Sequence, residues 1–508
     1  MKRRIFVRNT ALASVALPLQ LNGFGMTAHS EASHLVQALG NVPAANEDHV
    51  LVIINMVGGN DGLNTVIPVA QYSQYYNLRS NIAIPTNKLL ALEGETDIAL
   101  HPALSGMRDL YNDGLVSIVH AAGYPDSNQS HARSSDIWMT GVSANQYAST
   151  GWAGRYLEQR FTGYPAGYPS ASMEDPLALQ IGYTATPTLQ GTTQSTGVTI
   201  NDANAFYQLI GESSNVAGED LPCCDAGDLV AFVRRQQVLA VGYSTEIKQA
   251  ADAGANLATY PTQNRLADQL KIVSRLIHGG LKSKIYFVSM DGFDTHSGQA
   301  ESSDVTTGTH ANLLKQLGDA VKAFYTDLQL QGTQQRVLSM TFSEFGRRAN
   351  SNSSLGTDHG QAAPMFLIGQ GLQKKQIGTP SNLVSDLLPV NPQPWETQRD
   401  LAMQIDFRRV YTDVLNDWLG NDPGDTAQIL YQPFATTSIL KPTIETIGTG
   451  NWADRSTWSA GRMPLAGETV IVNAGHTLRI PQSVSVHKME VHGTLDVKPG
   501  VQLNITGQ

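Results

Sequence analysis

The chain has 508 residues, 41% of them hydrophobic and 15% charged, and its formal net charge is −10 at pH 7. This length exceeds what one hydrophobic core usually serves, so we expect a large globular domain and a smaller appended one. The acidic balance excludes nucleic acid as an expected partner, because no cluster of basic residues is available to bind phosphate backbones. The two cysteines, Cys223 and Cys224, are adjacent, so they predict loop thiols that are free or locally bridged and no disulfide framework.

The first thirty residues have the charge order of an export signal. A twin-arginine start at Lys2–Arg8 precedes an apolar stretch from Ala11 to Leu19 and a region of small residues. The stretch is short for a membrane span, so we interpret residues 1–30 as a twin-arginine signal peptide. The expected partner during export is the twin-arginine translocase, and the expected location is the periplasm, the cell surface or the medium. No later apolar run is long enough to predict a membrane span.

Buried strands and amphipathic helices alternate through most of the chain. Nearly continuous apolar runs, typical of buried parallel strands, occupy residues 50–57, 115–121, 285–290, 337–342 and 365–368. Apolar residues at helical spacing predict helices over residues 103–113, 263–278 and 310–330. This alternation predicts an α/β sandwich around a mostly parallel sheet, which we assign to residues 31–440.

After about residue 442, helical periodicity gives way to short alternating stretches separated by glycine turns. This pattern predicts a small all-β module over residues 445–508. The stretches cover residues 469–472, 477–480, 488–491, 494–497 and 502–505. With Asn451–Trp452 and Thr457–Trp458, the module resembles a glycine-rich, β-helix-forming module of extracellular proteins, which implies a stabilising cap or a carbohydrate-binding surface.

The dipeptide Asp358–His359 is the strongest candidate for chemistry. A carboxylate oxygen and an imidazole nitrogen on one tight turn are ligands that zinc and manganese take. The flanking residues Gly356 and Gly360 let the backbone bend sharply around the pair. The alternative is an exposed turn with no ligand.

Four more candidate ligands follow strand ends. Asp61 comes after the first apolar run, and Asp294 and His296 come after the third. Glu344 follows the fourth run. Ligands of open α/β sheets gather beyond the carboxyl ends of the strands, so we expect these side chains in one site. Helix caps, exposed turns and surface salt bridges are the alternatives for each residue alone.

Two further residues are candidates for catalysis. Arg347 follows the fourth strand, where its guanidinium suits an anionic oxyester, although a surface salt-bridge network is the alternative. Ser130 lies in a polar loop after the second strand. A serine hydroxyl near a metal can become a nucleophile, while a loop or cap serine is the alternative.

The order of motifs over residues 1–425 resembles a bacterial family of twin-arginine-exported proteins of unknown function, grouped with the alkaline phosphatase/sulfatase superfamily. The motifs that carry the resemblance are Gly58–Asn64, Ser130–His131, Gly151–Leu157, Gly292–His296, Ser343–Arg348, Gly356–Gly360 and Asp406–Arg408. The resemblance implies an alkaline-phosphatase-like fold. It also implies two divalent metals beside a Ser, Thr or modified Cys nucleophile.

By this resemblance, Asp61, Asp358 and His359 would hold one metal, and Asp294 with His296 would hold the other. Ser130 would be the nucleophile that attacks phosphorus or sulfur in line. The chain departs from the superfamily pattern, because Asp294 and His296 are unusually close and no histidine lies between His359 and His476. Either one ion alone binds, or one of three residues supplies the missing ligand: Glu344, His131 or His310.

The sequence therefore predicts an exported hydrolase of phosphate or sulfate esters that uses zinc or manganese, with one or two ions. Its substrate would be a small anionic ester or one linked to a polysaccharide. The alternative is a non-catalytic periplasmic or cell-surface protein that uses the same scaffold for binding or assembly. A third hypothesis is a glycan-handling protein attached through its C-terminal module.

Overall fold

The computed structural model describes residues 18–21, 24–27, 49–170, 173–182, 185–201, 242–373, 375–390, 397–440, 444–458, 463–464, 468–486 and 488–505. Two compact units are distinguished: His49–Leu440, and Lys441–Gln508 together with Met1–Asp48. The twin-arginine start at Lys2–Arg8 and the pair Cys223–Cys224 lie outside the described residues. Within the described part of the chain, no helix is both long and apolar enough to cross a membrane.

A nine-stranded sheet forms the centre of the larger unit. In spatial order it contains β15 (Gln376–Ile377), β7 (Val116–Gly123), β14 (Ala363–Gly369), β11 (Val337–Phe342), β3 (Val50–Met56), β10 (Ile285–Met290), β8 (Ala178–Ile181) and β9 (Val198–Ile200), and β18 (Ile405–Asp406) also pairs with β7. β14 runs antiparallel to both of its neighbours, while every other pairing is parallel. The prediction of a mostly parallel sheet is confirmed.

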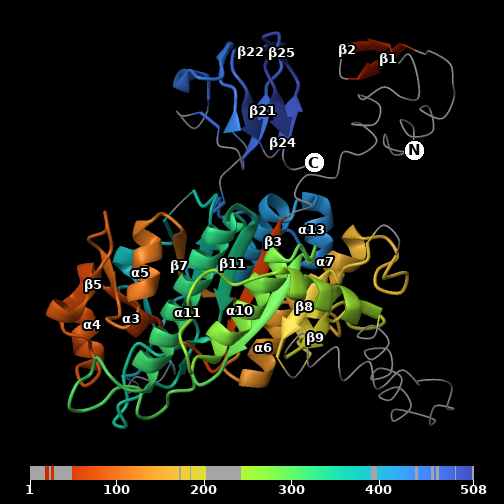
Figure 1. Ribbon diagram of the computed structural model, residues 1–508. Helices are drawn as coiled ribbons and strands as arrows, with labels where there is room; N and C mark the ends of the chain where they lie inside the picture. The colour runs from red at the N-terminus through yellow and green to blue at the C-terminus, as the bar shows by residue number, and fades with distance from the viewer. Residues whose placement is uncertain are drawn as a thin grey trace, which may run out of the picture. The chain divides into compact units, whose positions relative to one another are not determined.

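Two layers of helices cover the sheet, because β3 is apolar on both of its faces. Val50, Val52, Ile54 and Met56 face one side, where they share a core with α5 (Ser105–Asn112), α10 (Arg265–His278) and α11 (Thr309–Gln331). Leu51 and Ile53 face the other side, with α6 (His131–Thr140), α7 (Trp152–Arg160) and α12 (Phe407–Asp413). Figure 1 shows α10 and α11 side by side across one face of the sheet.

The helix ends follow the local sequence. Asn264 caps the start of α10, since its side chain accepts a hydrogen bond from the Ala267 N–H. α11 ends at Gly332, whose left-handed conformation stops the helix. Because β10 ends at Met290 and α11 begins at Thr309, the loop between them runs from residue 291 to residue 308. This loop carries Asp294 and His296.

The C-terminal unit consists of small parallel sheets. β19 (Ile444–Glu445), β21 (Thr469–Val472) and β24 (Lys488–Val491) form one; β20 (Gly450–Asn451), β22 (Thr477–Ile480) and β25 (Thr494–Val497) form another; β23 (Val484–Val486) and β26 (Leu503–Ile505) form a third. Inward-facing residues such as Val470, Leu478 and Trp458 are buried together. The all-β character predicted here is confirmed, and a β-helix remains a prediction.

Candidate metal centre

Loops that follow three neighbouring strands approach one another closely. Gly58, after β3, has φ +124°, and a Cβ atom there would lie 2.3 Å from the Asp294 nitrogen. Gly356 precedes the Asp358–His359 pair, and a Cβ atom there would lie 2.3 Å from the His296 carbonyl oxygen. Only glycine therefore allows these loops to pack so tightly. The close packing brings their side chains to one edge of the sheet.

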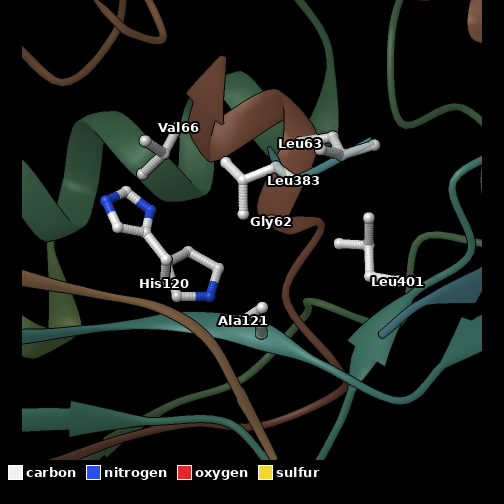
Figure 2. A pocket seen from close by; sticks show the side chains of 9 residues that line it. Gly62, Leu63, Val66, His120, Ala121, Leu383 and Leu401 are labelled. Carbon is white, nitrogen blue, oxygen red and sulfur yellow. The ribbon is translucent and has the colours of Figure 1, made fainter. Parts of the chain in front are cut away.

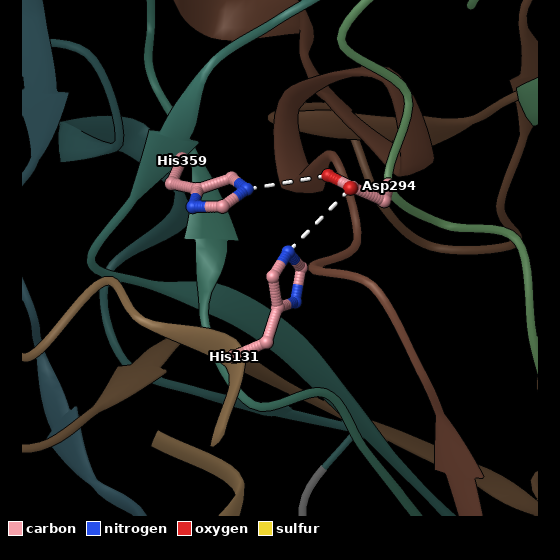
Figure 3. A group of neighbouring side chains, drawn as sticks. All are labelled: His131, Asp294 and His359. Carbon is pink, nitrogen blue, oxygen red and sulfur yellow. Dashed lines mark hydrogen bonds and ion pairs between the residues drawn. The ribbon is translucent and has the colours of Figure 1, made fainter. Parts of the chain in front are cut away.

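Three side chains from distant segments meet at this edge. His131 begins α6, Asp294 follows β10, and His359 begins β13 (His359–Gly360). Their ligand atoms lie within 4.8 Å of one another. Figure 3 shows both imidazoles turned toward the carboxylate: Asp294 Oδ1 is 3.2 Å from His359 Nε2, and Asp294 Oδ2 is 3.5 Å from His131 Nε2. Two imidazole nitrogens and a carboxylate oxygen form a donor set that suits zinc or manganese.

His296 adds a third imidazole to this group. Its Nε2 lies 2.9 Å from His359 Nε2 and 3.2 Å from Asp294 Oδ1. Two ring nitrogens at this distance hydrogen-bond only when one is protonated and the other is not. A shared cation would satisfy both nitrogens without that proton. His296 is therefore the candidate for a fourth ligand.

In each of these imidazoles the other ring nitrogen, Nδ1, lies within hydrogen-bond distance of an acceptor oxygen. His131 Nδ1 lies 2.8 Å from Glu344 Oε1, His359 Nδ1 lies 2.8 Å from the Gln129 carbonyl oxygen, and His296 Nδ1 lies 3.2 Å from Asp358 Oδ1. Such partners fix the tautomer that leaves Nε2 unprotonated and able to bind a metal. The predicted ligands Glu344 and Asp358 thus lie at the centre, but the structure places them behind imidazoles.

Glu344 is held rigidly in this supporting position. Its side chain is buried, and its two carboxylate oxygens accept hydrogen bonds from the Gly58 N–H at 2.9 and 3.1 Å. The Ser134 hydroxyl of α6 donates to the Glu344 carbonyl oxygen. Glu344 therefore connects the loop after β3, the end of β11 and the helix that carries His131.

Replacing Glu344 with glutamine is expected to weaken metal binding by about 10–100-fold. The neutral amide would polarise His131 less and could not accept at both oxygens. Competition with a chelating indicator measures the affinity of the purified protein. Glu301→Gln, at an exposed position on the loop before α11, is the matched control. Equal affinity in both variants would contradict the role assigned to Glu344.

Arg347 connects the loops of the centre through hydrogen bonds from its buried side chain. Its side chain is fully buried, and its guanidinium donates to carbonyl oxygens of Gly59 and Thr357 at 2.8 Å and to Asp294 Oδ1 at 2.6 Å. Burial raises the pKa of Asp294, but hydrogen bonds from Arg347 and His359 outweigh it and lower that pKa to about 2. Burial lowers the pKa of His359. The carboxylate is thus ionised and the imidazole neutral at pH 7, as metal binding requires.

The structure places Asp61 outside this group. Its buried carboxylate accepts from Arg79 Nη1 at 2.7 and 2.6 Å, and from the Gln299 amide. His310, another residue that could supply the missing metal ligand, is buried against Asn60, with Nε2 3.0 Å from Asn60 Oδ1. Burial lowers the pKa of His310 to about 4.

Ser130 directly precedes His131. It is exposed, occupies the N-cap position of α6, and makes no side-chain cap bond. Its backbone N–H donates to Asn128 Oδ1 at 2.9 Å, which fixes the turn before the helix. The hydroxyl is therefore carried on the same turn as a candidate ligand.

A small pocket elsewhere in the larger unit is lined by apolar side chains and His120 (Figure 2). Gly62 and Leu63 come from α3 (Gly62–Thr65), and His120 and Ala121 come from β7. His120 Nε2 lies 2.8 Å from Gln376 Oε1, and burial lowers its pKa to about 4. No charged group lines this pocket, so it does not suit an anionic ester.

Comparison with solved structures finds similarities at low sequence identity. A protein of the alkaline phosphatase superfamily from Vibrio parahaemolyticus is 11% identical, with a TM-score of 0.30 and coverage of 66% of this chain and 64% of that chain. The lipoteichoic acid synthase LtaP from Listeria monocytogenes is 10% identical, with a TM-score of 0.30 and coverage of 67% and 70%. The PsFucS1 sulfatase from Pseudoalteromonas sp. is 11% identical, with a TM-score of 0.31 and coverage of 85% and 81%.

The chain thus spans slightly less than two thirds of the first of these structures. A search of curated proteins finds no match. Residues 236–430, which include Asp294, His296, Glu344 and the Asp358–His359 pair but not His131, match the model of a family described as a protein of unknown function (DUF1501).

Proposed function

We propose that the protein is an exported, metal-dependent hydrolase of phosphate or sulfate esters. The observation that carries this proposal is the convergence of three imidazoles on Asp294, each with an acceptor behind its Nδ1. His131, Asp294 and His359 would hold one zinc or manganese ion, with His296 as the fourth ligand. A structural role alone does not require three imidazoles to turn the same nitrogen toward one carboxylate.

The centre is open to solvent, as a substrate site must be. The side chains of Asp294 and His296 are both 47% exposed, while the supporting side chain of Glu344 is 2% exposed. A bound divalent ion would polarise the oxygens of an anionic ester. Buried Arg347 would hold Asp294 in place and ionised, since all of its contacts lie within the protein.

Ser130 would supply the nucleophile. Its oxygen would form a bond to phosphorus or sulfur, and the ester oxygen would leave with the electron pair of the broken bond. The hydroxyl proton would pass to solvent, and the leaving oxygen would take up a proton. Water would then release phosphate or sulfate from the serine. The motif resemblance to the alkaline phosphatase/sulfatase superfamily supports this role.

The test combines metal analysis with a panel of phosphate and sulfate esters. We expect about one zinc or manganese ion per chain, in line with the one set of converging ligands among the described residues. Ser130→Ala should retain this ion and lose at least about 10³-fold in turnover, as expected for a nucleophile. Ser127→Ala, in the same loop, is the control.

Two outcomes would overturn the hydrolase. Absence of any bound ion in the exported protein would remove the metal centre. An ion bound without hydrolysis of any ester in the panel would instead support a metal-dependent binding or assembly protein on the same scaffold.

The twin-arginine pattern at Lys2–Arg8 supports export. Cell fractionation of a variant with lysine in place of both Arg3 and Arg4 tests whether export depends on this pattern.

A further inference from the structure

Gln299 occupies a buried position beneath the metal centre, in the loop between β10 and α11. Its Oε1 accepts hydrogen bonds from the hydroxyls of Thr295 at 3.0 Å and Thr357 at 2.6 Å. Its Nε2 donates to Asp61 Oδ2. The orientation of the amide follows from chemistry, because an ionised carboxylate only accepts and must face the NH₂ group. The carbonyl oxygen is thereby directed at the two threonines.

These two threonines belong to the loops that carry the candidate ligands. Thr295 separates Asp294 from His296, and Thr357 directly precedes Asp358 and His359. The loops also contact each other directly, since the Thr357 N–H donates to the Thr295 carbonyl oxygen at 3.1 Å. One amide oxygen thus binds both loops, within two residues of each ligand they contribute.

The opposite end of Gln299 rests on a buried ion pair. Asp61 and Arg79 have fully buried side chains, with Oδ2 and Nη1 2.6 Å apart. Arg79 also donates from Nε to the Ala349 carbonyl oxygen at 2.8 Å and from Nη2 to the Arg348 carbonyl oxygen at 2.6 Å. The charge of Asp61 is therefore balanced inside the protein. A neutral glutamine suits this position, whereas a glutamate would repel Asp61.

We propose that Gln299 is a positioning residue for the metal centre, which sets the spacing between the loop of Asp294 and His296 and the loop of His359. The inference rests on the proposed metal centre. Asp61 then serves as the anchor of Gln299, with Arg79 as its permanent counter-ion. We call the three hydrogen bonds of the Gln299 side chain, to Thr295, Thr357 and Asp61, the clamp. The positions of the ligands around the ion, and therefore the affinity for the ion, depend on this clamp.

The test compares Gln299→Met with Gln180→Met. Methionine matches the length of glutamine but makes none of the three hydrogen bonds. Gln180 is also buried, on β8, where its Oε1 accepts from the Thr186 N–H, so its replacement reports the general cost of losing a buried amide. Both proteins are purified as full chains, and binding of Zn²⁺ and Co²⁺ is measured together with thermal unfolding.

We expect Gln299→Met to weaken Zn²⁺ binding by about 10–100-fold and to change the visible absorption spectrum of bound Co²⁺. Gln180→Met should leave both unchanged. Thr295→Val and Thr357→Val each remove one clamp bond and should weaken binding by smaller factors. These threonine variants decide the question if Gln299→Met does not fold.

The outcomes separate this inference from the function proposed above. If the parent binds Zn²⁺ and all clamp variants bind it equally, with the same Co²⁺ spectrum, Gln299 is purely structural and the inference fails while the metal centre stands. If the parent binds no ion, both fail. If binding weakens in the clamp variants but not in Gln180→Met, the positioning role holds even when no ester is hydrolysed.

Discussion

Asp294→Asn is expected to remove the metal ion. Asp294 is the carboxylate toward which three Nε2 atoms point, and its oxygens lie 3.2–3.5 Å from them. Asparagine offers one neutral oxygen and an NH₂ group that cannot bind a metal. It would also leave the buried Arg347 guanidinium without its anionic partner. The loss of metal affinity should exceed the loss of about 10–100-fold that is expected when only the hydrogen-bond partner of a ligand is removed.

Metal content per chain, measured after dialysis against a fixed low concentration of Zn²⁺, checks this prediction. Asp109→Asn is the matched control, since Asp109 is also partly exposed and pairs with basic side chains, Arg108 and Lys322. The control should retain the parent content. An Asp294→Asn protein that still holds its ion would show that the imidazoles do not form the binding site. Hydrolysis of esters should fall in parallel with metal content.

The strands of the sheet core could be predicted because burial on both faces leaves a continuous apolar run. β10 and β11 begin and end at the predicted residues, 285–290 and 337–342. β8 and β9 were missed, since four and three residues are too few for a periodic signal. The antiparallel direction of β14 was also not predictable, because the apolar pattern of a buried strand does not depend on its direction.

The site could be predicted in part for a similar reason. The ends of parallel strands lie at one edge, so Asp294 and Glu344 are expected in one site, and in the structure both contact His131. The resemblance implies different metals for His359 and Asp294, whereas the structure places their side chains 3.2 Å apart. The sequence indicates His131 only as a substitute ligand, because its partner Glu344 is 213 positions away in sequence. Burial is equally hidden in sequence. The sequence predicts that the Arg347 guanidinium binds a substrate anion. In the structure this guanidinium is buried and donates to backbone carbonyl oxygens and to Asp294.

Asp61 illustrates the limit of reasoning from motifs alone. Its place after β3 and the superfamily resemblance both predict a metal ligand, and that assignment remains a prediction. The structure offers another partner, Arg79, which lies on α4 (Tyr72–Arg79). An aspartate that faces a guanidinium and one that faces a metal have the same local sequence. Only the fold shows which cation is near.

Arg79→Met is expected to lower the free energy of unfolding by about 3–5 kcal/mol. The variant removes the partner of a buried carboxylate and leaves its charge uncompensated. Burial alone raises the pKa of Asp61, and the charges of Arg79 and His310 outweigh it and lower that pKa in the parent. Without Arg79 the effect of burial dominates, so the carboxyl takes up a proton more readily. The destabilisation should therefore be larger at alkaline than at acidic pH.

Chemical denaturation in the presence of a chelator measures the effect, and a second substitution separates charge from packing. Asp61→Leu combined with Arg79→Met replaces both charges with apolar groups, which is often nearly neutral, so the double variant should be more stable than Arg79→Met alone. A metal titration of Arg79→Met then distinguishes the two cations. If Asp61 serves only as the anchor of Gln299, the variant gains no second ion and added Zn²⁺ does not restore its stability. If Asp61 is a ligand that Arg79 blocks, the ion count rises above that of the parent and stability returns with it.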